Sequence, residues 1–212
     1  SGTVTIADND TPRVSVTTST ATADEASGAL VFDFVRESGS TTAVLTVNFS
    51  VSGSTDATAD YTVSGPNVTL NSGAGTGTIE LGNGVSLAQL TVTPTNDALV
   101  EGNETVGVTV TAGTNYNIDT QSSDSGTIDD NDTATLEIAA TPSIKEEDGT
   151  QTVSVTLRTS DGASGTATLA PGVTLTADVV DAASGSAISG TDYGALPTQM
   201  VTFSVGDGNG AT

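Results

Sequence analysis

A short acidic phrase occurs twice in this sequence. Residues 5–10 read TIADND and residues 127–132 read TIDDND, so the copies lie 127 − 5 = 122 residues apart. Each copy is a short strand-like run that ends in a cluster of acids. A repeat of this length is the size of a whole small domain. The chain is therefore predicted to be a piece of a tandem array with acidic clusters at its joints.

The repeat divides the chain into three parts. Residues 1–10 are predicted to be the terminal strand of a preceding repeat, residues 11–132 a complete β-sandwich, and residues 133–212 a partial second repeat. The same offset of 122 residues relates Glu147 to Glu25. The second repeat lacks counterparts of residues 85–132, so we expect it to be truncated by about three strands.

Hydrophobic residues recur at every second position along most of the chain. The clearest runs in the complete unit are residues 13–17, 29–36, 43–51, 85–93 and 105–111. Turn-forming Gly, Asn, Ser and Pro separate these runs. Period-two alternation is typical of half-buried antiparallel strands, and about seven short strands in a unit of this length favour a sandwich. The predicted fold is all-β, with tandem immunoglobulin-like antiparallel sandwiches whose core includes Phe32, Phe34 and Phe49.

Charge and composition exclude several classes of function. The chain has 26 acidic and 4 basic residues, a formal net charge of −22, and neither cysteine nor histidine. Nucleic acid is excluded as a partner because phosphate contacts need Lys and Arg. No apolar run approaches the length of about 20 residues that membrane insertion needs. Without His or Cys there is no system to activate a nucleophile, so we expect no enzymatic activity.

The acids concentrate in alternate loops. If the strands run alternately up and down, the first, third and fifth connections and the end of the last strand all meet at one pole. The candidate ligands at this pole are Glu25, Asp60, Asn96, Asp97, Glu101, Glu104, Asp129, Asp130 and Asp132, and Glu147 and Asp192 are the corresponding residues of the second unit. Crowded carboxylates are unfavourable without cations, and calcium takes six to eight oxygen ligands from flexible loops. The alternative is a solvated acidic surface with no bound ion.

Two motifs in order resemble the Calx-β domain. The first is residues 96–105 (NDALVEGNET), the second is residues 126–132 (GTIDDND), and Asp60-Tyr61 adds a third match. The resemblance implies calcium-binding β-sandwiches and carries the ligand role to the acidic residues of the candidate set. Asn96 and Asn131 stand where some members have Asp, a departure that would weaken or reduce the bound ions. Tandem copies resemble bacterial adhesin or matrix proteins.

Three functions remain open at this point. The leading hypothesis is a secreted or cell-surface adhesion module whose calcium ions stiffen the joints with neighbouring repeats, with a matrix protein or glycan as the surface ligand. A calcium-dependent carbohydrate- or protein-binding module is the alternative, and an exposed Tyr61 or Tyr116 near the acidic pole would favour it. A calcium sensor of a membrane transporter is the third. Head-to-tail self-assembly, in which residues 1–10 complete the second unit of another molecule, is a further hypothesis; the alternative is that the fragment simply begins and ends there.

Overall fold

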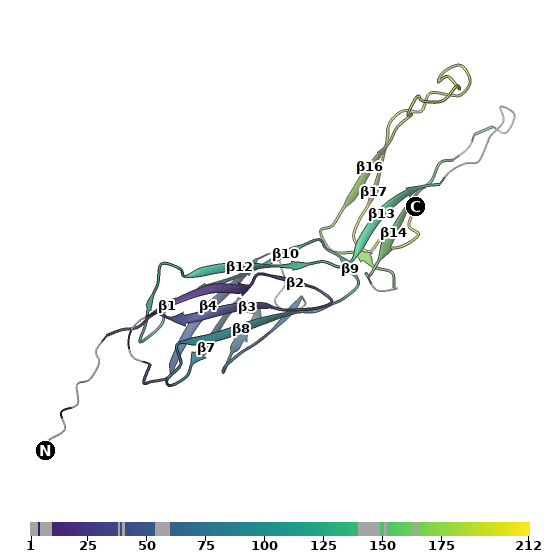
Figure 1. Cartoon of the computed structure of the whole chain (residues 1–212). Helices are drawn as coiled ribbons and strands as arrows, with labels where there is room; N and C mark the ends of the chain where they lie inside the picture. The colour runs from purple at the N-terminus through teal and green to yellow at the C-terminus, as the bar shows by residue number, and fades with distance from the viewer. Residues whose placement is uncertain are drawn as a thin grey trace. The chain divides into compact units, whose positions relative to one another are not determined.

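The computed structural model describes residues 4, 10–37, 39, 41–53, 60–139, 149–150, 152–162 and 165–212. The predicted terminal strand at residues 1–10 and Glu147 fall largely or wholly outside this part of the chain. Two compact units are present. Unit 1 comprises residues 1–96 and 103–131, and unit 2 comprises residues 97–102 and 132–212. Figure 1 shows the described elements as strands, which confirms the predicted all-β class.

Unit 1 is a sandwich of two sheets. The first sheet has the strand order β11-β1-β3-β8-β5, formed by Asn117–Ile118, Arg13–Thr20, Leu30–Arg36, Leu87–Pro94 and Tyr61–Ser64. The second has the order β2-β12-β10-β4-β7-β6, formed by Thr22–Asp24, Ser123–Asp129, Glu104–Val110, Leu45–Gly53, Thr76–Leu81 and Thr69–Asn71. A 3-10 turn, η1 (Ser72–Ala74), lies between β6 and β7.

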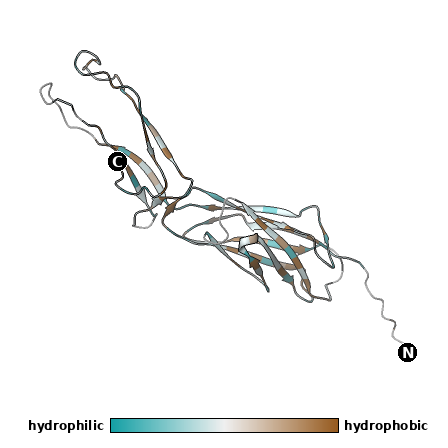
Figure 2. Ribbon diagram, turned by 180° about the vertical axis from the view of Figure 1, so that it is seen from behind, coloured by the Kyte–Doolittle hydropathy of each residue, from teal (hydrophilic) through white to brown (hydrophobic). Residues whose placement is uncertain are grey.

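Alternating side chains fill the space between the sheets of unit 1. Along β3 every second residue is buried, and Figure 2 shows brown and paler residues mixed along the strands. The three phenylalanines predicted for the core are fully buried, and the rings of Phe34 and Phe49 lie 5.7 Å apart. Burying a side chain of this size contributes about 1.5–3 kcal/mol. The core therefore follows directly from the period-two pattern.

Tyr116 closes the lower end of this core. It is 6% exposed, its hydroxyl donates to the backbone oxygen of Thr111, and it accepts a hydrogen bond from the backbone amide of Asn48 at 3.1 Å. Gly113 lies against the ring, because a Cβ there would come within 2.5 Å of it. The tyrosine thus fixes the loop after β10 to strand β4.

The strand directions confirm the alternation assumed from the sequence. β3 is antiparallel to β1 and β8, β10 is antiparallel to β4 and β12, and β4 is antiparallel to β7. Consequently the ends of β2, β4, β8 and β12 and the starts of β5 and β10 lie at the same pole of unit 1. We call this end the acidic pole.

Unit 2 contains three two-stranded sheets. They pair β13 with β14, β15 with β9, and β16 with β17. The strands are Thr133–Ile138, Val155–Ser160, Thr168–Leu169, Leu99–Val100, Leu175–Val179 and Gln199–Phe203. Its core is small and is built around Val155, Leu157, Leu169 and Phe203. None of the described helical segments has the length and apolarity to span a membrane.

Candidate metal site at the acidic pole

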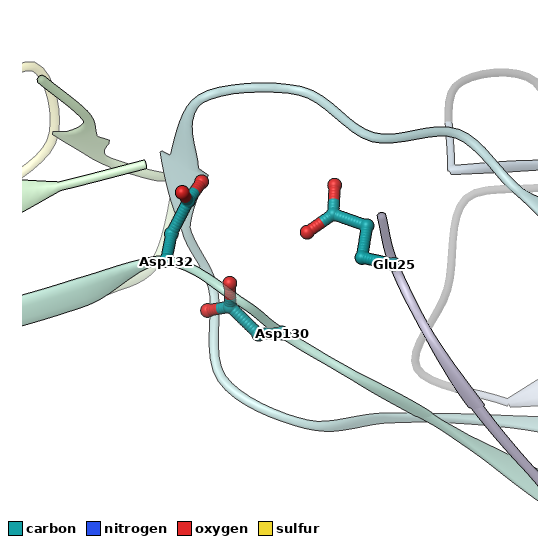
Figure 3. Close-up of side chains that lie close together, drawn as sticks. All are labelled: Glu25, Asp130 and Asp132. Carbon is teal, nitrogen blue, oxygen red and sulfur yellow. The ribbon is translucent and has the colours of Figure 1, made fainter. Parts of the chain in front are cut away.

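Three of the predicted ligands converge after strands β2 and β12. Glu25, Asp130 and Asp132 each offer a carboxylate oxygen, and these oxygens all lie within 4.8 Å of one another. Figure 3 shows the Glu25 carboxylate facing the carboxylates of Asp130 and Asp132 from a separate segment of the chain. Residues far apart in the sequence thus place three negative charges around a common point.

Backbone hydrogen bonds hold Glu25 at this point. β2 ends at Asp24, and the amide of Glu25 donates to the carbonyl of Asp129 at 2.9 Å. Beyond it, Asp24 Oδ1 accepts from the amide of Ala26 at 2.9 Å, and Asp24 O accepts from the amide of Ser27 at 2.9 Å. This turn directs the chain away immediately after Glu25. The glutamate is therefore anchored to β12 itself, whose last residues lead into the two aspartates.

Two of the three acids are largely withdrawn from solvent. Glu25 is 9% exposed and Asp132 is 5% exposed. Between the two aspartates, Asn131 donates from Nδ2 to Asn96 Oδ1 at 2.9 Å, and within the described part of the chain no donor reaches its buried Oδ1. Burying like charges and an unsatisfied amide oxygen is costly. A cation bound to the carboxylate oxygens would offset the repulsion between them, so the donor set fits an oxygen-preferring metal.

Three other predicted ligands accept hydrogen bonds. Asp97 Oδ1 accepts from the amide of Leu99 at 2.8 Å and Asp192 Oδ2 from the amide of Ile188 at 2.8 Å, so each fixes its own loop in unit 2. Asp129 Oδ1 accepts from Asn103 Nδ2 at 2.7 Å and joins the start of β10 to the end of β12.

Three further predicted ligands are not members of the three-carboxylate group. Asp60 precedes β5, Glu101 lies between β9 and β10, and Glu104 is the first residue of β10. Each of the three is partly exposed. The ligand role of Glu147 lies outside the described residues and stays a prediction.

Sequence reasoning missed the contribution of two asparagines. Asn131 was noted only as a departure from Asp, yet its Oδ1 is buried and its Nδ2 donates to Asn96 Oδ1 at 2.9 Å. Asn103, absent from the candidate set, joins β10 to β12 through Asp129. The position of Asn131 within the acidic phrase was the available signal. Asn103 gave none, because its partner is 129 − 103 = 26 residues away.

The two tyrosines that would have favoured a carbohydrate site lie in the core instead. Tyr61 is 4% exposed and Tyr116 is 6% exposed. Tyr61 is the first residue of β5 and points into the sandwich, and the Tyr116 hydroxyl is hydrogen-bonded to the backbone of unit 1. Neither presents an aromatic surface at the acidic pole.

Comparison with known protein families identifies the fold. The Calx-beta domain model matches residues 7–132 and again residues 128–209. The chain belongs to the Calx-beta family. The two matches cover nearly the whole sequence, so this Calx-beta chain is a tandem one. No curated protein gives a significant match to the sequence.

Solved structures of low sequence identity also resemble the Calx-beta chain. The apo-form Calx CBD1 domain is 15% identical, covers 56% of this chain and 96% of its own, and has a TM-score of 0.42. CBD12 from CALX1.2 is 13% identical, covers 92% of this chain and 71% of its own, and has a TM-score of 0.43. The calcium binding domain CBD12 of CALX1.1 is 15% identical over 51% of this chain and 40% of its own, with a TM-score of 0.39. The family assignment rests on the domain matches.

Proposed function

We propose that the Calx-beta chain binds calcium at the acidic pole of unit 1 and serves as a structural or adhesive repeat of an extracellular protein. The observation that carries the proposal is the group of Glu25, Asp130 and Asp132, whose carboxylate oxygens lie within 4.8 Å of one another. Three carboxylate groups from two segments of the chain thus face one small volume.

The chemistry of the donors favours calcium over other metals. Carboxylate and amide oxygens are hard ligands, and softer metals prefer the His and Cys that this chain lacks. Magnesium demands near-ideal octahedral geometry and keeps several waters, whereas calcium accepts six to eight oxygens in irregular arrangements. Acids that follow two different strands suit the less demanding ion.

A structural role follows from where the ligands lie in the repeat. Asp130 and Asp132 belong to the phrase that ends one repeat and begins the next, so bound calcium would order the chain at each joint with a neighbouring repeat. Secretion, a cell-surface location and adhesion to a matrix protein or glycan are part of this proposal. Because Tyr61 and Tyr116 are buried, no observation favours the carbohydrate-binding alternative.

Calorimetric titration of the whole chain with calcium tests the binding proposal. Extracellular calcium modules often bind at roughly 10⁻⁴–10⁻³ M, and we expect saturable binding in this range. Glu25→Gln and Asp132→Asn should each weaken it by about tenfold, which corresponds to about 1.4 kcal/mol. Glu37→Gln, at the opposite end of unit 1, is the matched control and should leave it unchanged. Equal losses in all three variants would indicate diffuse screening by an acidic surface, and no binding would refute the proposal.

Head-to-tail self-assembly remains a separate prediction. Light scattering of the chain in calcium, with and without residues 1–10, tests it directly. A monomeric mass for the intact chain would show that strand donation is wrong.

A further inference from the structure

The first and last segments of unit 1 run side by side in the same direction. At the lower end, β1 pairs in parallel with β11, and at the acidic pole, β2 pairs in parallel with β12. Hydrogen-bonded partners in the two segments keep nearly the same separation in sequence. It is 117 − 12 = 105 residues at the lower end and 129 − 25 = 104 residues at the acidic pole. We call this parallel association of the two segments, from Pro12–Asn117 to Glu25–Asp129, the terminal zipper.

Hydrogen bonds outside the regular ladders extend over the whole length of the zipper. They are Asn117 N to Pro12 O (2.8 Å), Asp119 N to Val14 O (2.9 Å), Val16 N to Gln121 O (3.0 Å), Thr18 N to Asp124 Oδ2 (2.7 Å), Thr127 N to Ala21 O (2.8 Å) and Glu25 N to Asp129 O (2.9 Å). Each such bond contributes about 1 kcal/mol net. The two segments are thus joined from one pole of unit 1 to the other.

Asp124 bridges the place where the first segment changes sheets. The chain leaves β1 at Thr20 and enters β2 at Thr22, so backbone pairing with the last segment is interrupted there. Asp124 Oδ2 accepts from the amide of Thr18, and Asp124 Oδ1 accepts from the amide of Ser125 at 2.9 Å. Burial alone would raise the pKa of Asp124, but these hydrogen bonds outweigh it and hold the pKa below its usual value. The side chain replaces the missing backbone bond.

The direction of the zipper decides how it meets tension. Tension along the array pulls the first segment at its lower end, before Pro12, and the last segment at the acidic pole, after Asp129. Because the two segments are parallel, this tension slides them in opposite directions along their length and strains all the bonds of the zipper together. If they were pulled from the same end, the bonds would break one after another.

We propose that unit 1 resists mechanical tension, in that the terminal zipper opposes it in shear and calcium reinforces the upper end of the zipper. Glu25 directly follows β2 and Asp130 directly follows β12, so one ion held by both would tie together the two strand ends that tension separates. The reinforcement rests on the proposed calcium binding; the zipper itself does not. Forced unfolding is governed by the unfolding rate, so the zipper is expected to act by delaying the first step of unfolding.

Single-molecule pulling of the whole chain tests the zipper. The sequence has no cysteine, so a pair of exposed residues changed to Cys gives unique attachment points. Thr11→Cys with Thr133→Cys applies tension at opposite ends of the zipper and loads it in shear. Thr11→Cys with Thr114→Cys applies tension at the same end and peels it open. In chelator we expect a severalfold higher unfolding force in the shear geometry, and equal forces would overturn the proposal.

A substitution within the zipper tests whether its hydrogen bonds resist tension. Asp124→Ala should lower the unfolding force in the shear geometry. Asp33→Ala is its matched control, since Asp33 accepts from Ser19 Oγ at 3.0 Å and Gln89 Nε2 at 2.9 Å, neither of which belongs to the last segment. Equal losses in both variants would contradict a specific role of the zipper.

Millimolar calcium should raise the shear force of the unsubstituted chain and leave the peeling force nearly unchanged, and Glu25→Gln should abolish the increase. If calorimetry shows calcium binding but the shear force does not rise, the reinforcement is wrong and the proposed calcium binding stands. If calcium does not bind, the proposed function fails, and the comparison of the two geometries in chelator still decides whether the zipper bears load.

Discussion

Replacing Asp130 by Asn should stabilise the calcium-free chain and reduce the stabilisation that calcium provides. Asp130 shares the site with two other carboxylates at distances of up to 4.8 Å. Two unit charges at this distance repel by about 0.9 kcal/mol at the dielectric constant of water and by about 3.5 kcal/mol at an effective value of about 20. The substitution removes two such pairs. The calcium-free chain should therefore become more stable, by about 2 kcal/mol at the aqueous limit.

Calcium should narrow this difference in stability. At calcium equal to 100 times its Kd, the unsubstituted chain gains about 2.7 kcal/mol. If Asp130→Asn weakens binding tenfold, it gains only about 1.4 kcal/mol at the same concentration. For a domain of this size 1 kcal/mol corresponds to roughly 4 °C in Tm, so both effects are measurable.

Differential scanning calorimetry at low ionic strength is the appropriate assay, because salt screens the repulsion. Glu80→Gln removes one negative charge from β7, away from the site, and should shift Tm little in chelator or calcium. If Asp130→Asn lowers Tm in chelator, the three acids do not repel one another in the folded chain, and the electrostatic reasoning is refuted. If both variants respond equally to calcium, Asp130 is not a ligand.

Three further predictions concern unit 1. Tyr116→Phe removes the hydroxyl that joins Thr111 to Asn48, so urea denaturation should show a loss of about 2 kcal/mol; an unchanged midpoint would mean that water replaces the hydroxyl. Asp124→Asn should cost about 1 kcal/mol at pH 7. Because the folded-state pKa of Asp124 is depressed, that difference should persist above about pH 4, the ordinary range of Asp, and vanish as the pH falls through the folded pKa; a pH-independent difference would exclude the charged form as its cause. Gly53→Ala should destabilise by more than about 3 kcal/mol, since φ is +143° and a Cβ would lie 1.9 Å from a backbone oxygen of β10; wild-type stability would show that the strand end can move.

Much of the fold could be predicted because the strands of unit 1 carry a local signal. The runs predicted at residues 29–36, 43–51 and 105–111 became β3, β4 and β10 with shifts of one or two residues at their ends. A side-chain period of two requires no knowledge of the partner strand. The short strands β2, β9 and β11 were not predicted, because two or three residues carry no measurable period.

The acidic pole could also be predicted from the sequence, but only as a group of acidic residues at one end of the sandwich. Strand alternation places loops at poles, and the acids of alternate loops therefore share one end of the sandwich. Alternation does not determine which side chains meet. Asp97 and Glu101 were predicted to lie in one site with Glu25. In the structure they belong to unit 2, where β9 pairs in parallel with β15.

The sequence by itself determined the repeat, the all-β class, the buried phenylalanines and the end of the sandwich at which the acids gather. Each of these depends on patterns within a few residues or on the comparison of one segment with another. The tertiary structure alone decided that Glu25 meets Asp130 and Asp132, that Tyr61 is buried, and that the first and last segments pair in parallel. The meeting of the three acids and the pairing of the two segments depend on register between residues about 105 positions apart, and the burial of Tyr61 depends on the register of β5 with β8. A shift of one residue would turn every side chain to the opposite face, and no local pattern in the chain specifies that register.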